Sequence, residues 1–482
     1  MLLSPRSTVA LLAACALLAS CAVGPDYVRP TLDLPASYKE ARQAGDWKTA
    51  EPQAADSRQP WWEAYGDTTL NGLIADAERA NQNLRVAEAQ YRQAQALAQQ
   101  TRAGLYPTVG ANAGVARARS NSSGQVRTGS TDQLGLSASW APDLWGGVRR
   151  SIESGEAGAQ ASADDLAGAH LSIQAALVQD YLQLRTTDQL RDLYAATTAA
   201  YARALQLTQA QRAAGVALAS DVALAESQLA SAQAAATDLD ASRALLEHAI
   251  AVLTGRAPAQ FSLAPVAAFR ALLPATPAGL PSQLLERRPD IAAAERRVAA
   301  ANAAIGVARA AHYPNLVLSA GGGFSAASLA SLFDTPSRVW SLGAALAQTL
   351  FDGGLRDARD AQAIAAYDAA AATYKQTVLA GFQQVEDNLA TLTVLEREAG
   401  YQAQAVRAGQ AAERLALAQY RGGTANYLAV VTAQALSLVN QRADVQLRGR
   451  QLAASVGLVA ATGGGWTTAD PPVAAVAATA PR

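Results

Sequence analysis

Small apolar residues recur three and four positions apart along extended stretches of this chain, which is the spacing of one helix face in a coiled coil. One stretch has these residues at Leu73, Ala77, Ala80, Leu84, Ala87, Tyr91, Ala94 and Ala98. A second stretch has them at Ile291, Ala294, Val298, Ala301 and Ile305. Both patterns stop at a Tyr-Pro pair, Tyr106-Pro107 and Tyr313-Pro314, because the residue before proline is disfavoured in helical geometry. The pattern predicts two helices that end at these pairs.

After each Tyr-Pro pair, apolar positions alternate with small or polar ones, which is the period of a β-strand. The alternating apolar residues are Leu134, Leu136, Ala138 and Trp140, then Leu316, Leu318, Ala320, Gly322 and Phe324, then Trp340, Leu342, Ala344 and Leu346. A weaker strand is expected from Thr108 to Ser120, and polar tips are expected at 121–129 and 328–336. Strands of about ten residues with this alternation are typical of outer-membrane proteins. In the strand Trp340 to Leu350, the even-numbered residues should therefore face lipid.

A half-buried sheet of a water-soluble protein is the other interpretation of these strands. The sequence supplies no further strands for such a sheet to pack on, and long helical patterns flank both hairpins. These patterns run from about Val148 to Ala214 and from Leu355 to Arg421, so each helix would be about 100 Å long at 1.5 Å per residue. Shorter helices should return to Thr254 and Ala461. Six helices and four strands result.

The chain is a tandem repeat with a period of about 207 residues. Leu144-Trp145-Gly146-Gly147-Val148-Arg149 returns as Leu350-Phe351-Asp352-Gly353-Gly354-Leu355-Arg356, and the two Tyr-Pro pairs are 207 residues apart. The expected division is a signal peptide 1–20, an N-terminal segment 21–66, a first repeat 67–255 with a hairpin at 105–145, a linker 256–281, a second repeat 282–461 with a hairpin at 313–351, and a tail 462–482.

The N-terminus predicts export and a lipid anchor. An apolar run from Val9 to Leu18 follows Arg6 and is too short to span a bilayer as a helix, but it fits the core of a signal peptide. Leu18-Ala19-Ser20-Cys21 resembles a bacterial lipobox, which makes Cys21 the acylated residue; an ordinary cleavage site is the alternative. Residue 22 is alanine, not aspartate, which favours sorting to the outer membrane.

Composition and motifs give no sign of catalysis or of nucleic-acid binding. The chain has 39 basic and 40 acidic residues, so it has no electrostatic case for nucleic acid. Its three histidines, His170, His248 and His312, stand on separate segments without metal-ligand spacing. The glycines at 321–323 lie in a strand and have no phosphate-loop context. We therefore expect no enzyme activity, no cofactor and no metal site.

Four strands cannot close a barrel, and an open sheet edge in hydrocarbon leaves unpaired backbone groups. The strand count alone allows two, three or four protomers.

Four segments resemble the motifs of TolC-like outer-membrane factors, in the NodT/OprM lipoprotein branch that serves RND efflux systems. They are the segments Cys21 to Tyr27, Trp61 to Asp67, Leu280 to Ile291 and Leu350 to Gly354.

This resemblance covers essentially the whole mature chain and implies a mainly α fold with membrane β-structure. It implies a homotrimer in which an outer-membrane β-barrel, four strands per protomer, continues into a long periplasmic α-helical barrel. The partners would be a periplasmic adaptor (membrane fusion protein), an inner-membrane RND pump and outer-membrane lipid. The protein would be a passive exit duct for drugs, toxic compounds such as solvents, or metal ions. The rival hypothesis is a lipid-anchored periplasmic coiled-coil scaffold protein without a pore.

The periplasmic aperture is expected at the turns that end the two long helices, at Gly215 and Gly423, next to Arg421. The resemblance implies that Tyr420 hydrogen-bonds Asp221 and holds the tip closed. Asp221 as a simple helix cap is the alternative. Ala425, Ala429 and Thr432 stand where relatives carry charged residues, so Asp221 is expected to be the main carboxylate at this constriction.

Overall fold

The computed structural model describes residues 22–32, 37–40, 60–122, 125–266, 269, 272–274 and 287–464. The predicted signal peptide, Cys21, much of the linker 256–281 and nearly all of the predicted tail lie outside the described residues. The chain divides into two compact units. The first contains Met1–Thr31, Gln90–Ala163 and Ala293–Lys375, and the second contains Leu32–Ala89, Asp164–Ala292 and Gln376–Arg482.

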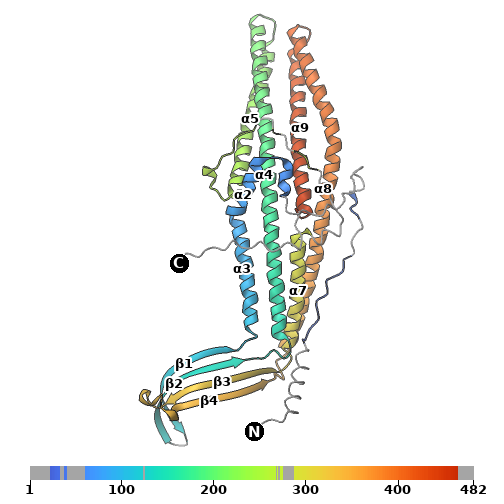
Figure 1. Cartoon of the computed structure of the whole chain (residues 1–482). Helices are drawn as coiled ribbons and strands as arrows, with labels where there is room; N and C mark the ends of the chain where they lie inside the picture. The colour runs from blue at the N-terminus through green and yellow to red at the C-terminus, as the bar shows by residue number, and fades with distance from the viewer. Residues whose placement is uncertain are drawn as a thin grey trace. The chain divides into compact units, whose positions relative to one another are not determined.

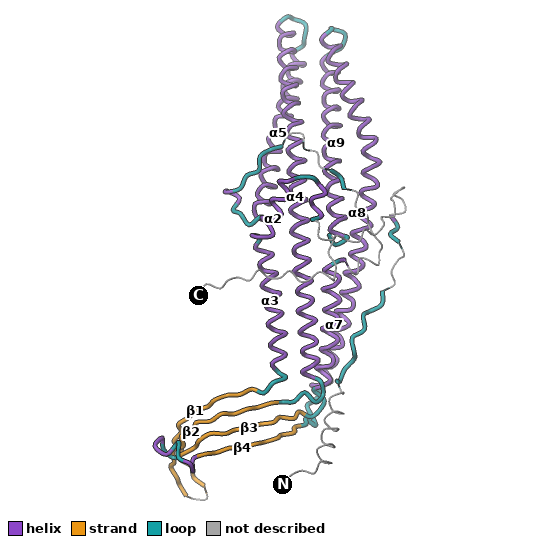
Figure 2. Tube along the Cα trace, in the orientation of Figure 1, coloured by secondary structure: helices purple, strands orange, loops and turns teal. Residues whose placement is uncertain are grey.

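The described part of the chain contains seven α-helices and four strands (Figures 1 and 2). The helices are α2 (Thr68–Ala80), α3 (Gln82–Ala103), α4 (Gly147–Ala213), α5 (Ala219–Leu253), α7 (Pro289–Ala310), α8 (Leu355–Arg421) and α9 (Tyr427–Ala461). The long helices α4 and α8 have 67 residues each, as the sequence predicts, and the returning helices α5 and α9 have 35 each. None of the helices in the described ranges has the length and hydropathy needed to cross a membrane.

The expected single helix before Tyr106 is wrong, because Asn81 divides it into α2 and α3. Asn81 has extended backbone geometry, with φ −65° and ψ 127°. Its side-chain oxygen accepts hydrogen bonds from the backbone N–H of Asn83 and Leu84 at 2.8 and 3.1 Å, which caps α3. Its side-chain amide donates to the carbonyl of Leu253 at 2.8 Å. The break thus ties the start of α3 to the end of α5.

The four strands form one antiparallel sheet in the order β1-β2-β3-β4. Their bounds are Thr108–Ser122, Gln125–Trp140, Asn315–Ala326 and Arg338–Ala347. The two hairpins lie side by side, with β2 of the first repeat paired to β3 of the second (Figure 1). The free edges of the sheet therefore belong to β1 and β4.

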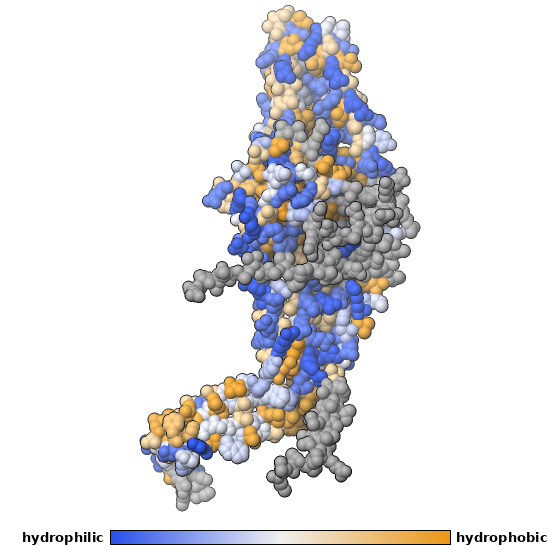
Figure 3. Space-filling view, viewed as in Figure 1, coloured by the Kyte–Doolittle hydropathy of each residue, from blue (hydrophilic) through white to orange (hydrophobic). Residues whose placement is uncertain are grey.

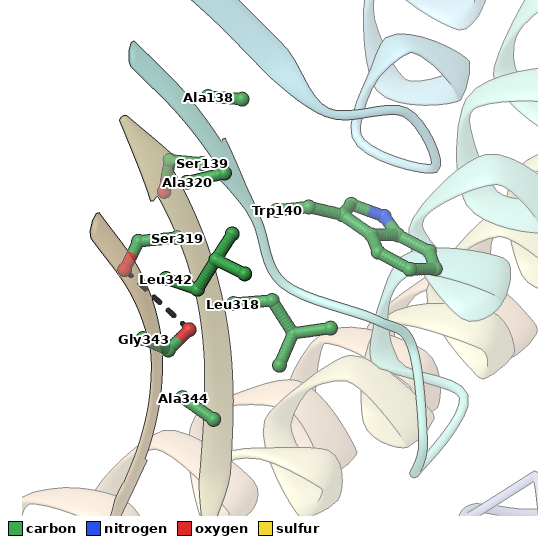
Figure 4. A pocket seen from close by; sticks show the side chains of 9 residues that line it. All are labelled: Ala138, Ser139, Trp140, Leu318, Ser319, Ala320, Leu342, Gly343 and Ala344. Carbon is green, nitrogen blue, oxygen red and sulfur yellow. Dashed lines mark hydrogen bonds between the residues drawn. The ribbon is translucent and has the colours of Figure 1, made fainter. Parts of the chain in front are cut away.

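The register gathers the apolar side chains of all four strands on one face. Leu136 lies opposite Ala111 on one side and Gly322 on the other, and Ala320 lies opposite Leu342. In Figure 4, Trp140, Leu318 and Leu342 extend to one side of the sheet, whereas the labelled serines extend to the other. The visible sheet surface in Figure 3 is mostly orange and white. The expected alternation in β4 is confirmed, since its even-numbered residues share the apolar face.

Two expected strand limits are wrong. β4 ends at Ala347, not at Leu350, and the next side chain, Gln348, donates to the carbonyl of His312 at 3.0 Å. The first hairpin stays paired out to Ser122 opposite Gln125, within the segment expected to be a loop. The mostly polar residues 121–122 and 125–129 thus lie within the paired strands and do not end them.

The second unit has a mixed apolar and hydrogen-bonded core around α2. The hydroxyl of Tyr181 on α4 donates to Asp67 at 2.6 Å, and Asp67 also caps α2. The hydroxyl of Tyr65 is 3.2 Å from that of Ser455 on α9. Burial raises the pKa of both tyrosines to about 12, so both hydroxyls stay protonated. The hydroxyl of Tyr181 donates to Asp67, whereas either hydroxyl of the Tyr65–Ser455 pair can donate.

A buried ion network holds the segment that follows α5. Asp188 accepts hydrogen bonds from Arg185 at 2.9 Å and from Arg243 at 2.8 Å. The same guanidinium of Arg185 donates to the carbonyl of Ala264 at 2.9 Å, and Arg243 donates to the carbonyl of Leu263. These charged groups are paired, and donors of both arginines reach backbone carbonyls, which offsets much of the cost of burying them, although the Nε of Arg185 has no hydrogen-bond partner. The start of the linker is thereby fixed on α4 and α5.

We predict opposite tolerance of charge on the two sheet faces. Replacing Leu342 with Arg should destabilise the membrane-inserted protein by about 2–4 kcal/mol near mid-bilayer, because the apolar face would carry a charge into lipid. Arg at the neighbouring Ser341 should cost much less. Denaturant titration of protein folded into phospholipid vesicles measures both, and equal costs would contradict the assigned faces.

Candidate aperture at the helical-hairpin turns

The turn after α4 and the turn after α8 have the same backbone design. Gly215 and Gly423 adopt left-handed φ values of 80° and 72°. The N–H that follows each glycine reaches back to a carbonyl five residues earlier, Val216 to Gln211 and Thr424 to Gln419, each at 2.9 Å. This is the 6→1 bond of a Schellman motif, which needs a left-handed residue at its centre. A Cβ at either glycine would meet no atom within 4 Å, so the backbone conformation, not crowding, favours glycine here.

Asp221 serves as a helix cap. It is the third residue of α5, and its carboxylate accepts the backbone N–H of Leu218 at 3.1 Å. The equivalent helix α9 is capped differently, by the side chain of Asn426, which accepts the N–H of Ala429 at 3.1 Å. A carboxylate in the first helical turn is also favoured by the helix dipole. In the structure, Asp221 therefore has the role of a helix cap, which was the alternative to a bond with Tyr420.

Tyr420 is directed to another partner. Its hydroxyl donates to the Oγ1 of Thr208 on α4 at 3.4 Å, and both residues are buried. The expected bond between Tyr420 and Asp221 is thus wrong for this protomer, because the carboxylate is engaged by the backbone of its own helix. The ring of Tyr420 lies 5.2 Å from that of Tyr427, at an angle of 59°.

Thr208 is the centre of this group of side chains. It is fully buried, and its own hydroxyl donates to the carbonyl of Ala204 at 2.9 Å, so its oxygen is free to accept. Burial raises the pKa of Tyr427 to about 12, partly offset by a hydrogen bond to Thr208, and the charge of Asp221 adds to the rise. We call Thr208, Tyr420 and Tyr427 the tip cluster. It joins α4 to both α8 and α9.

Sequence reasoning missed Thr208 and Tyr427, although a signal for the first was present. Tyr194, Tyr201 and Thr208 are spaced seven residues apart on α4 and are all buried. They therefore lie in one stripe along the same face of the helix, and each carries a hydroxyl group. Burial raises the pKa of Tyr201. The stripe shows that α4 presents hydroxyl groups to the neighbouring helices.

Arg421 ends α8 and is exposed, outside the tip cluster. The described residues include no cluster of three or more His, Cys, Asp or Glu side chains suited to a metal ion.

His170 pairs with Glu78 at 2.7 Å. Burial raises the pKa of Glu78, but hydrogen bonds from His170 and Gln174 outweigh it and lower the pKa. This pair is a local contact between α2 and α4.

We predict that Thr208→Val loosens the turns. Valine keeps the shape of threonine but leaves the buried Tyr420 hydroxyl without its acceptor and removes the hydroxyl that interacts with Tyr427, at a cost of about 1–3 kcal/mol. Hydrogen exchange at the amides of 214–218 and 422–426 should become faster. The matched control is Thr237→Val on α5, whose hydroxyl makes the same kind of bond to Gln233 on an exposed surface. Equal effects of the two substitutions would contradict the role of Thr208.

Known proteins resemble the chain over nearly its full length. The family described as outer membrane efflux protein matches residues 73–256 and 280–464. The pyoverdine export outer membrane protein OpmQ of Pseudomonas aeruginosa is 34% identical over 471 residues, which cover 95% of this chain and 97% of OpmQ. The toluene efflux pump outer membrane protein TtgF of Pseudomonas putida is 32% identical over 464 residues, covering 93% and 95% of the two chains.

Solved structures show the same fold. The outer-membrane channel OprN superimposes with a TM-score of 0.87 at 31% identity, covering 92% of this chain and all of OprN. The open state of the Neisseria gonorrhoeae MtrE outer membrane channel gives a TM-score of 0.80 at 27% identity, covering 92% and 98%.

Proposed function

The chain belongs to the outer membrane efflux protein family, and we propose that it is the exit duct of a tripartite RND-type pump. A periplasmic adaptor and an inner-membrane RND pump would deliver substrate to it. The observation that carries the proposal is the sheet, which has a continuous apolar face and is joined directly to helices of 67 residues. A scaffold without a pore would have no use for such a face.

The free edges of the sheet support assembly into a closed trimer. β1 and β4 each leave one row of backbone N–H and C=O groups unpaired, at several kcal/mol per group in hydrocarbon. On the apolar face, Leu342 and Leu346 are 75% and 68% exposed in the single chain. Three copies would supply twelve strands, within the range of outer-membrane barrels. The two repeats 67–255 and 282–461 would then form six similar segments around one axis.

The first described residues support a lipid anchor on Cys21. The N–H of Val23 donates to the carbonyl of Trp145 at 3.1 Å. A Cβ at Gly146 would lie 2.9 Å from the Cα of Ala22, so the chain passes closely over the junction between β2 and α4. Acyl chains on Cys21 would therefore start where the sheet ends and could enter the outer membrane there.

We predict that Cys21→Ser removes the lipid without preventing insertion. Mass spectrometry of the mature protein should show the loss of the acyl mass, and the substituted protein should still fractionate with outer membranes, because the sheet is itself an anchor. The expectation would be wrong if the wild-type chain carried no acyl group, or if the substituted chain became soluble in the periplasm.

The tip cluster suggests how the duct is kept closed. Thr208 stands on α4 and its two tyrosine partners on α8 and α9, so each protomer's two helical hairpins are joined at their turns. Opening would require these hairpins to separate or rotate, and binding of the adaptor would supply the free energy. The exported substrates would be drugs, other toxic small molecules or metal ions, and the pump would make the choice among them.

Conductance in planar lipid bilayers tests both the channel and its closure. The wild-type protein should conduct weakly, and Tyr420→Phe should raise conductance. Removing one neutral hydrogen bond of about 0.5–1.5 kcal/mol shifts the closed-to-open ratio roughly two- to tenfold. Asp221→Ala should weaken block by multivalent cations, with Asp238→Ala on the exposed part of α5 as the control. A wild-type protein that forms no channels would contradict the proposed function, and an unchanged Tyr420→Phe channel would contradict the proposed closure.

A further inference from the structure

An aromatic stack fastens the first repeat to the second at the junction between strands and helices. Trp145 follows β2, and Tyr313 precedes β3. Their rings are 4.9 Å apart and nearly parallel, at 22°. The indole N–H of Trp145 also donates to the carbonyl of Pro314 at 2.7 Å. This contact lies at the same seam as the pairing of β2 with β3.

The repeat carries a second copy of each partner, and both copies are exposed. Phe351 stands 206 residues after Trp145, and Tyr106 stands 207 residues before Tyr313. In the single chain, Phe351 is 89% exposed and Tyr106 is 71% exposed. Phe351 follows β4 and Tyr106 precedes β1, which form opposite edges of the sheet. Within one chain, Phe351 and Tyr106 therefore lie at opposite edges of the sheet, whereas Trp145 and Tyr313 stack on each other.

We propose that Phe351 of one subunit stacks on Tyr106 of the next, and that this stack sets the register between β4 and the neighbouring β1. The proposal rests on the trimer proposed above and adds its contact residues. The partner is a second copy of this chain, because the missing half of the contact is the other half of its own repeat. The side chain of phenylalanine has no N–H group, so Phe351 cannot repeat the hydrogen bond that the indole of Trp145 donates to the proline carbonyl.

The register follows from the known seam. Trp140, five residues before Trp145, pairs with Leu318, five residues after Tyr313. The equivalent positions are Leu346, five residues before Phe351, and Ala111, five residues after Tyr106. Leu346 should therefore lie opposite Ala111, and two residues further along each strand Ala344 should lie opposite Ala113. All four residues belong to the apolar face of the sheet.

A shift of two residues is the competing register. It would keep the same faces and place Leu346 opposite Ala113. The hairpins themselves differ by such a shift, since Val109 pairs with Ala138 but its counterpart Leu316 pairs with Leu346. Two residues correspond to about 6.6 Å along a strand. Aromatic pairs stack at centroid distances of about 4.5–7 Å, so the shift would carry Phe351 away from Tyr106. The stack therefore distinguishes the two registers.

Disulfide cross-linking tests the register in the full chain in outer-membrane vesicles. The chain has only two natural cysteines, Cys15 in the predicted signal peptide and Cys21. Ala113→Cys combined with Ala344→Cys should give a covalent trimer on oxidation, because opposed residues have Cα atoms about 4.5–5.5 Å apart, within disulfide reach. The matched pair is Ala113→Cys with Leu346→Cys, which lies one diagonal step away and should stay mostly uncross-linked.

The outcomes separate the register from the proposed function. Preferential cross-linking of the matched pair in conducting channels would overturn the register and the stack, while the trimeric duct would stand. Protein that cross-links in neither pair and sediments as a monomer would overturn the trimer itself. Preferential cross-linking of Ala113→Cys with Ala344→Cys would support the proposal.

The stack itself is tested by heat dissociation of the trimer. Tyr106→Ala and Phe351→Ala should each lower the dissociation temperature, and the double variant should dissociate little earlier than either single variant, because both remove one contact. Leu350→Ala is the control, since Leu350 is 90% exposed and adjacent to Phe351. Its effect should add fully to that of Tyr106→Ala. Additive losses for Tyr106 and Phe351 would overturn the stack.

Discussion

The unpaired backbone of the sheet edges is the constraint on which the structure depends. In water, the outer rows of β1 and β4 would be hydrated, but in hydrocarbon they have no partner except another strand. The apolar face makes water equally unsuitable for the sheet as a whole. Each chain supplies only four strands, two from each repeat, and every strand contributes to the apolar face. Such a sheet is satisfied in lipid only if several chains share one closed sheet. The tandem repeat is thus a means of building a ring from few copies.

In the proposed duct, the helical turns would meet a different requirement, because they would have to stay together when the duct is closed and separate when it opens. Their backbone groups are satisfied locally, by the Schellman bonds after Gln211 and Gln419 and by the caps at Asp221 and Asn426. The contact between hairpins combines Tyr420, Tyr427 and Thr208 with an apolar cluster that includes Ala225, Ala416 and Val430. Each turn is therefore satisfied within its own hairpin, and in the proposed duct a partner protein would act on the packed contact between hairpins and not on the turns themselves.

The elements were predictable from sequence where a single periodicity governs them, and the exceptions depend on distant partners. The 67-residue helices and the faces of the sheet follow from spacings of 3.5 and 2. The break at Asn81 was missed because the apolar spacing continues through it, while its amide is held by Leu253, 172 residues away. The hydrogen-bond partner of Tyr420 was missed because Thr208 lies 212 residues earlier on another helix. The seven-residue spacing marks Thr208 as part of a buried stripe of α4, but it does not identify the partner on α8.

The N-terminal segment imposes an order of events during biogenesis. Pro25 accepts a hydrogen bond from Asn302, 277 residues later, and Tyr27 donates to Glu295 on the same helix. Gly24 lies so close to Gly306 that a Cβ would come within 2.4 Å of the Cα of Gly306. An exported chain emerges from its N-terminus, so the first residues to leave the cytoplasm have no surface to dock on until the second repeat has followed and α7 has formed. The segment that follows the proposed lipid anchor would thus be exported early and be among the last parts of the chain to reach its final place.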